Sequence, residues 1–173
     1  MDIETDIQRI TSLAKIKEDE NWRFRTFLKS ADLSIRKLDS IVREHYEFVA
    51  ERIDCCTCAN CCAVMRPVLS TRDIGRMAGH LQISRKAFIS DYLKAADDEP
   101  GYVFCRRPCP FLQEKRCVLY DARPEVCRSF PNLHKREFVF RLIQVVENCS
   151  VCPIVYNVME GLKLHLWSRR HRR

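Results

Sequence analysis

Five cysteines fall within eight consecutive residues of this chain, from Cys55 to Cys62. Cys55, Cys58 and Cys61 are spaced C-x2-C-x2-C, and Cys62 follows directly. In a reducing compartment, thiols this close together are typical of a soft-metal or iron–sulfur ligand set and not of a disulfide framework. The run therefore predicts a fold organised around a metal site, because ligands bring distant residues to one point.

The N-terminal sequence favours a reducing compartment. Residues 1–6 are acidic and lack the basic start and the apolar run of a signal peptide. No stretch approaches the roughly 18 apolar residues of a membrane helix. We therefore expect a cytoplasmic protein without a membrane segment. The chain has eleven cysteines, an odd number, so at least one could not pair internally. The alternative is that many are small buried residues, with Cys56 and Cys105 as the main candidates.

Composition argues against several function classes. The chain has 173 residues and 4 glycines, which fits one domain with a helical extension and leaves no phosphate-binding loop. Its net charge is +7, and part of it comes from the tail Trp167–Arg173. We interpret this tail as a solvated helix end and not as a nucleic-acid site. No pattern supports hydrolysis. His80, His134 and His165 are interpreted as isolated surface or structural residues.

The hydrophobic pattern predicts a small, mostly helical α+β protein with a few short strands. Residues 1–53 are expected to form an N-terminal helical extension, 54–156 a cysteine-cluster metal-binding domain, and 157–173 a helix end and basic tail. Apolar residues recur every three or four positions in the extension, which predicts two helices. These helices either pack on the cysteine domain or form a hairpin that recruits a protein partner, and we expect a partner there. The oligomeric state is not indicated.

Local signals predict the elements of the cysteine domain. Ser70 and Asp73 form a capping-box pattern that predicts a helix over about 71–81, and Ser84 can cap another over about 85–94. The other expected elements are a turn at 97–101, strands at 102–105 and 117–120 with a turn near 114–115, a short helix from Pro124 through Cys127, a strand over 138–142, and a last helix from Pro153 through Leu166.

The first interpretation of the cysteine run is an iron–sulfur cluster. C-x2-C-x2-C matches the first three ligands of a bacterial ferredoxin cluster, whose next cysteine precedes a proline. Cys109 and Cys152 both precede prolines, and the spacing does not choose between them. Cys61 and Cys62 are expected to point apart because they are adjacent.

The rival interpretation is zinc. A four-thiolate zinc site commonly uses two C-x2-C pairs, and Cys58–Cys61 and Cys149–Cys152 are such pairs. The clustered thiols exceed the needs of one tetrahedral ion. We therefore favour an iron–sulfur cluster, with zinc second.

The downstream motifs resemble a known family. In order they are Cys55-x2-Cys58-x2-Cys61-Cys62, Pro108-Cys109-Pro110-Phe111-Leu112, Cys117-x2-Tyr120 and Arg123-Pro124-x2-Cys127-Arg128-x-Phe130-Pro131. This set resembles the YkgJ-type cysteine-cluster family, a zinc- or iron-chelating domain with a CxxCxxCC signature, over about residues 54–153. The resemblance implies these metal ligands: Cys55, Cys58, Cys61, Cys62, Cys109, Cys117 and Cys127, with Cys152 as an addition.

The chain departs from the family pattern at two places. Ala59 stands where a glycine is common, which constrains the backbone of the run. Cys152-Pro153-Ile154 lacks the glycine that often follows the proline, which makes the assignment of Cys152 less secure. The same domain resembles part of the longer flagellin lysine N-methylases, so a protein lysine N-methylase-like activity is the alternative function. This chain leaves no room for their additional substrate domain.

Two arginines flank the downstream cysteines. Arg123 and Arg128 either donate to cluster sulfurs or to an anionic ligand, or form ion pairs with Asp121 or Glu125. The sequence leaves both alternatives open.

Overall fold

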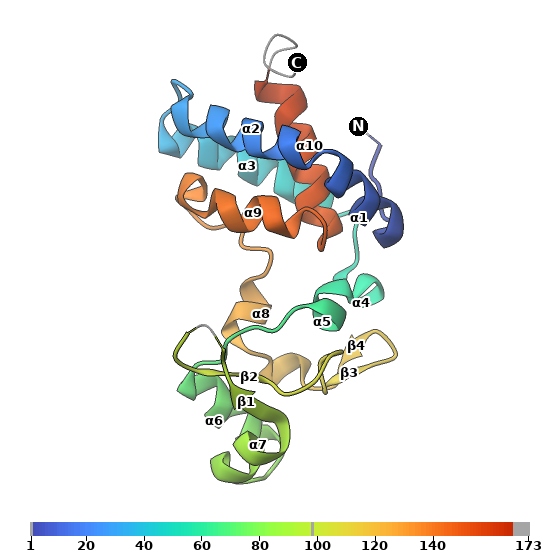
Figure 1. Ribbon diagram of the computed structural model, residues 1–173, viewed down its shortest axis with the longest axis vertical. Coiled ribbons are helices and arrows are strands. Elements are labelled where there is room, and N and C mark those ends of the chain that lie inside the picture. Colours follow the sequence, from blue (N-terminus) through green and yellow to red (C-terminus); the bar gives the residue numbers. More distant parts are fainter. Residues whose placement is uncertain (1, 98, 168–173) are drawn as a thin grey trace. The chain divides into compact units, whose positions relative to one another are not determined.

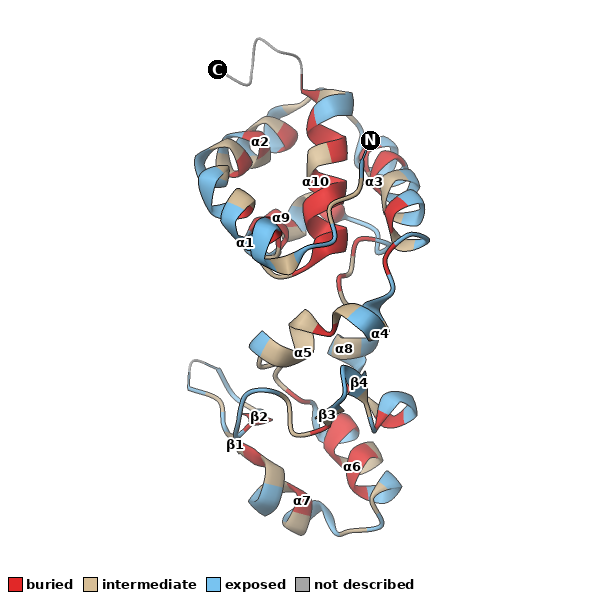
Figure 2. Cartoon of the chain, turned by 90° about the vertical axis from the view of Figure 1, so that its right-hand side faces the viewer, coloured by how far each residue is buried: buried red, intermediate tan, exposed pale blue. Residues whose placement is uncertain are grey.

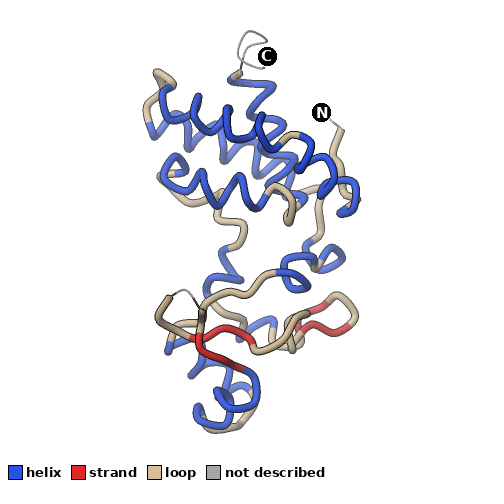
Figure 3. The backbone as a smooth tube through the Cα atoms, in the orientation of Figure 1, coloured by secondary structure: helices blue, strands red, loops and turns tan. Residues whose placement is uncertain are grey.

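The structure is a computed structural model that describes residues 2–97 and 99–167 (Figure 1). Asp98 of the expected turn and residues 168–173 of the expected basic tail lie outside the described residues. Figure 3 shows a mostly helical chain with short strands, which confirms the predicted α+β class. The chain divides into two compact units: Met1–Asp54 with Pro131–Arg173 form the first, and Cys55–Phe130 form the second.

The first unit is helical. Its elements are α1 (Ile7–Ile16), α2 (Glu18–Ser30), α3 (Ile35–Ala50), the 3-10 helix η2 (Phe138–Arg141), α9 (Leu142–Asn148) and α10 (Pro153–Leu166). The N-terminal segment forms three helices and not two, because Lys17 ends α1 and Ala31 leaves α2 in an extended conformation. Asp6 caps α1 by accepting from the backbone N–H groups of Gln8 and Arg9.

Helix α10 is the central helix of the first unit. It packs against α1, α3 and α9, and Figure 2 shows that most of its length is buried. Its buried Lys163 ion-pairs with Glu20 at 2.9 Å and with Glu160 at 2.7 Å. Because a buried charge is tolerated only when it is paired, this triad ties α2 to α10. The segment after Pro131, with Cys149 and Cys152, thus packs with the N-terminal helices.

The expected strand over residues 138–142 is wrong, because this segment forms η2 and the start of α9. The backbone N–H groups of Glu137 and Phe138 donate to the carboxylate of Asp39 in α3, at 2.8 and 2.9 Å. Phe138 is completely buried. This anchoring to α3 outweighs the strand preference of the sequence, since strand propensity depends strongly on context.

The second unit combines short helices with two hairpins. Its elements are α4 (Cys55–Cys58), α5 (Asn60–Val64), α6 (Thr71–His80), α7 (Arg85–Tyr92), β1 (Leu93–Ala95), β2 (Tyr102–Phe104), β3 (Leu112–Gln113), β4 (Arg116–Cys117), the 3-10 helix η1 (Tyr120–Ala122) and α8 (Glu125–Ser129). Strand β1 pairs antiparallel with β2, and β3 pairs antiparallel with β4. The predicted caps of α6 and α7 by Ser70 and Ser84 are confirmed.

Three predicted boundaries in this unit are wrong. Helix α7 ends at Tyr92 because Leu93 begins β1 and pairs with Phe104. The strand expected over 117–120 ends at Cys117, and the chain then turns into η1. Pro124 is the N-cap of α8 and not its first residue.

The core of the second unit leads directly to the cysteines. Phe111 is its aromatic centre, with ring centroids 6.0 Å from Phe88 and 5.7 Å from Phe104. Cys109 and Cys117 are partly buried and pack against this core. The hydrophobic packing therefore orients two of the expected ligands.

No single helix in the described part of the chain is long and apolar enough to cross a membrane. Phe138–Asn148 and Pro153–Leu166 together reach the required length and apolar composition, but the chain bends by 118° between them.

Candidate metal centre

The first cysteine run forms two short helices hinged at Ala59. Ala59 has a left-handed backbone, with φ 50° and ψ 11°, between α4 and α5. This conformation is strained for alanine and explains why glycine suits the position. The Sγ atoms of Cys61 and Cys62 lie 4.0 Å apart, so the expectation that these neighbours point apart is wrong.

The first run meets the downstream motifs. The backbone N–H of Cys109 donates to the carbonyl oxygen of Cys62, at 2.9 Å. Helix α4 also contacts β4, which ends at Cys117. Segments far apart in the sequence therefore lie together within this unit.

Four thiols influence one another electrostatically. Burial, together with a charge on Cys62, raises the pKa of Cys109 to about 11 and that of Cys127 to about 12. Burial and the same charge raise the pKa of Cys117. A hydrogen bond from Cys61 lowers the pKa of Cys62 to about 7. We call Cys62, Cys109, Cys117 and Cys127 the central thiols.

Two of the central thiols accept backbone hydrogen bonds. The N–H of Phe111 points to the sulfur of Cys109, and the N–H of Leu119 points to the sulfur of Cys117; each bond lowers the pKa of its thiol. Both donors belong to buried core residues. Because hydrogen bonds to sulfur favour the thiolate, this arrangement suits thiols that coordinate a metal.

Arg123 is the cation beside the central thiols. Its guanidinium lies 3.7 Å from the ring centroid of Tyr120, and its charge lowers the pKa values of Cys62, Cys117 and Cys127. Its buried Nε has no hydrogen-bond partner among the described residues. The charge of Arg123 therefore favours thiolates at these three cysteines.

The other flanking arginine has a structural contact. Arg128 donates through Nε to the carbonyl oxygen of Arg123 at 3.1 Å, and through Nη2 to that of Asp121. In the described residues, neither arginine forms an ion pair with Asp121 or Glu125, which removes that alternative within this part of the chain.

Helix α6 holds the segment that carries Arg123 and Cys127. The carboxylate of Asp73 accepts from the backbone N–H of Glu125 at 3.0 Å and pairs with Arg76 at 2.5 Å. Arg76 in turn donates to the carbonyl oxygen of Arg123 at 2.8 Å. The sequence identified Asp73 only as a helix cap, so its second contact was missed.

The donor set has the chemistry of a metal site. Thiolates gathered in one place repel, so they ionise together only beside a cation, and soft thiolates select zinc, copper(I) or iron–sulfur clusters. No group of three His, Cys, Asp or Glu side chains within residues 2–97 and 99–167 is arranged to hold a metal ion as it stands. Metal binding at these cysteines would therefore involve a rotation of their side chains.

The remaining cysteines differ in environment. All eleven lie among the described residues, and none of them forms a disulfide. Cys55 is exposed, and Cys58 and Cys61, which are close to Cys62 in sequence, are half-buried. Cys56, one candidate for a small buried residue, is half-buried and lies near enough to Cys117 to raise the pKa of that thiol.

The last three cysteines have contacts with residues other than the central thiols. Cys105 is exposed, not buried, with its Sγ 4.0 Å from the carbonyl oxygen of Asp91. Cys149 is buried in the first unit and donates to the carbonyl oxygen of Val145 at 3.3 Å. Cys152 is also buried in the first unit, at the N-cap of α10, and its role as a ligand stays a prediction.

Comparison with known proteins supports this site. No curated protein and no solved structure gives a significant match to the chain. The family described as "CxxCxxCC: Putative zinc- or iron-chelating domain" matches residues 54–153, a range that contains the first run and all the central thiols. The chain therefore belongs to the CxxCxxCC family of zinc- or iron-chelating cysteine-cluster domains.

Proposed function

We propose that the second unit binds an iron–sulfur cluster, with zinc as the second candidate. The central thiols would hold it, together with Cys55, Cys58 and Cys61 of the first run. The observation that carries this proposal is the grouping of the central thiols around the backbone contact between Cys62 and Cys109. The ferredoxin-like spacing and the excess of thiols over one zinc site support iron–sulfur.

The surface beside the thiols supports a role that involves a protein partner. Val118, Tyr120 and Val126 are 47%, 49% and 39% exposed. Val118 and Tyr120 lie within three residues of Cys117, and Val126 is next to Cys127. A bound cluster would supply one-electron transfer, and zinc would supply folding energy. We propose electron transfer to a partner, or metal-stabilised docking of that partner, as the function. Metal handling and a partner at the N-terminal helices stay predictions.

Metal analysis of protein purified without oxygen tests the proposal. We expect iron, acid-labile sulfide and broad visible absorption. Stoichiometric zinc without colour or sulfide would reject the cluster in favour of the second candidate, and absence of any bound metal would reject both.

A ligand variant tests the first run separately. Cys58→Ser should lower the metal content and the melting temperature together, because structural metal binding is also folding free energy. Cys105→Ser is the matched control, since this exposed thiol lies outside the expected ligand set. Full metal content and an unchanged melting temperature in Cys58→Ser would remove Cys58 from the site.

A further inference from the structure

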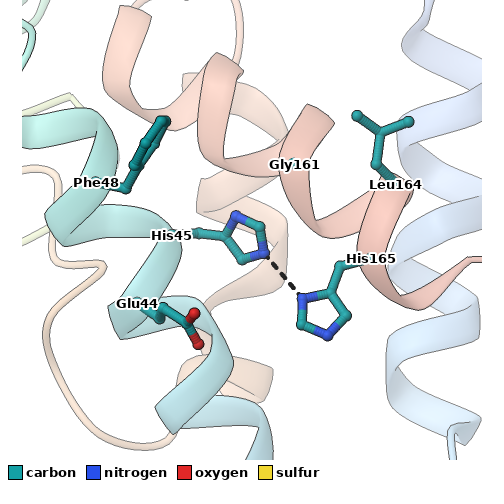
Figure 4. A pocket seen from close by; sticks show the side chains of 6 residues that line it. All are labelled: Glu44, His45, Phe48, Gly161, Leu164 and His165. Carbon is teal, nitrogen blue, oxygen red and sulfur yellow. Dashed lines mark hydrogen bonds between the residues drawn. The ribbon is translucent and has the colours of Figure 1, made fainter. Parts of the chain in front are cut away.

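Two histidines of the first unit meet across 120 residues of sequence. The Nε2 atom of His45 in α3 lies 3.1 Å from the Nδ1 atom of His165 in α10, as Figure 4 shows. The interpretation of His165 as isolated is therefore wrong. The two rings line an open groove of about 440 Å³ together with Glu44, Phe48, Gly161 and Leu164.

The separation of the two nitrogens is close to that of two ligands on one metal ion. Zinc–imidazole bonds of about 2.0–2.1 Å at a tetrahedral angle place the two nitrogens roughly 3.3 Å apart. The observed distance of 3.1 Å differs from this by a few tenths of an ångström. Replacing the shared proton by a metal ion therefore changes the spacing of the nitrogens little, and each ring turns so that its lone pair points at the ion.

The helices that carry the histidines are held firmly. Helices α3 and α10 pack directly on each other, and Val42 and Val49 of α3 are completely buried, as are Val158 and Leu162 of α10. Ligands on packed helices keep their geometry better than ligands on loops.

One nearby charge favours a bound cation. The 3.1 Å contact between the rings leaves one of the two facing nitrogens unprotonated as the acceptor, and an unprotonated imidazole nitrogen is the form that binds metals. Burial and the charge of His165 lower the pKa of His45, but the negative charge of Glu44, which lines the same groove, raises it. A cation between the imidazoles would benefit from that charge.

We propose that His45 and His165 form a second metal site, which binds one Zn²⁺ or a similar divalent cation such as Ni²⁺ or Cu²⁺. Imidazole suits these ions. Across the described residues, no group of three candidate side chains is arranged as a ligand set, so water molecules in the open groove complete the coordination. Both histidines lie outside the family match at 54–153, which makes this site independent of the cysteine centre.

Zinc binding to the full chain with its cysteine-bound metal in place tests the proposal. In equilibrium dialysis, the wild type should retain one zinc ion per chain more than His45→Ala or His165→Ala. His134→Ala and His80→Ala are the controls, from the first and second units, and should retain the same zinc as the wild type. Equal zinc in the wild type and the two site variants would overturn the proposal.

A second measurement separates binding at the histidines from effects on folding. Because the metal would join α3 to α10, added zinc should raise the melting temperature of the wild type but not that of the conservative variant His45→Asn. Far-UV circular dichroism should show equal helix content in both. If zinc raises both melting temperatures equally, the ion binds elsewhere and the site is rejected.

Discussion

The backbone N–H of Cys109 donates a hydrogen bond to the carbonyl oxygen of Cys62, at 2.9 Å. This bond joins the end of the first cysteine run to the second motif without any contribution from a metal. The entropy of closing so long a loop is therefore offset in part by the protein itself. A metal ion would then need to reorganise only the side chains of the thiols.

Changing Cys109 or Cys127 to serine should reduce the metal content and destabilise the second unit. Structural zinc contributes on the order of 10 kcal/mol to folding, so loss of a ligand should appear as partial unfolding. Metal analysis and thermal melting of each variant measure this, with Cys105→Ser as the control. Retention of all metal by both variants would exclude them as ligands.

Arg123→Gln should shift the reduction potential of the cysteine centre to a more negative value. The guanidinium charge acts on three of the central thiols, and a positive charge stabilises the reduced, more negative state of a cluster. Arg72→Gln removes the same charge from an exposed position on α6 and should have a smaller effect. Equal potentials in Arg123→Gln and the wild type would show that Arg123 does not face the centre.

Asp73→Asn should lower the free energy of unfolding of the second unit. It should also make that free energy depend less on pH. Burial raises the pKa of Asp73, but hydrogen bonds from Ser70, from the N–H of Glu125 and from Arg76 outweigh it, and the pKa lies below its ordinary value of 3.8. The carboxylate therefore stabilises the folded state above about pH 4, and this contribution is lost as the pH falls through the folded pKa.

The cost of Asp73→Asn at pH 7 should be about 1.5–3 kcal/mol, the usual range for hydrogen bonds to a charged group. Urea unfolding should show a smaller difference in the free energy of unfolding between the wild type and Asp73→Asn at pH 3 than at pH 7. Asp91→Asn, at an exposed position, is the control. A difference that is constant with pH would contradict the assigned role of the carboxylate.

Ala59→Val should lower metal loading, and Ala59→Gly should preserve it. The left-handed backbone at this position is a severe conformation for a β-branched residue and an easy one for glycine. Ala63→Val, within the short helix α5, is the control for added volume. Normal metal loading of Ala59→Val would mean that the hinge conformation is not needed for binding.

Local sequence signals predicted much of the fold. The caps at Ser70 and Ser84 and the start of α10 at Pro153 are confirmed, because each depends on hydrogen bonds or backbone preferences within a few residues. The strand expected over 138–142 was wrong because its conformation depends on Asp39, far away in sequence.

The candidate site was predictable only in part, because some of its contacts join residues far apart in sequence. The spacing and order of the cysteines identified the central thiols as expected ligands, and their proximity follows from the structure. The contact between Asp73 and Glu125 and the pair His45–His165 had no signal in the sequence. Both arise from tertiary packing between segments that carry no shared motif.

X-ray absorption spectroscopy at the metal edge, on the His45→Ala variant purified without oxygen, tests the central claim most directly. This variant removes the proposed imidazole site, so the remaining metal reports on the cysteines. We predict a first coordination shell dominated by sulfur, at about 2.3 Å for zinc and with an additional iron–iron distance for a cluster. A shell of oxygen or nitrogen atoms would contradict a metal centre built from the central thiols.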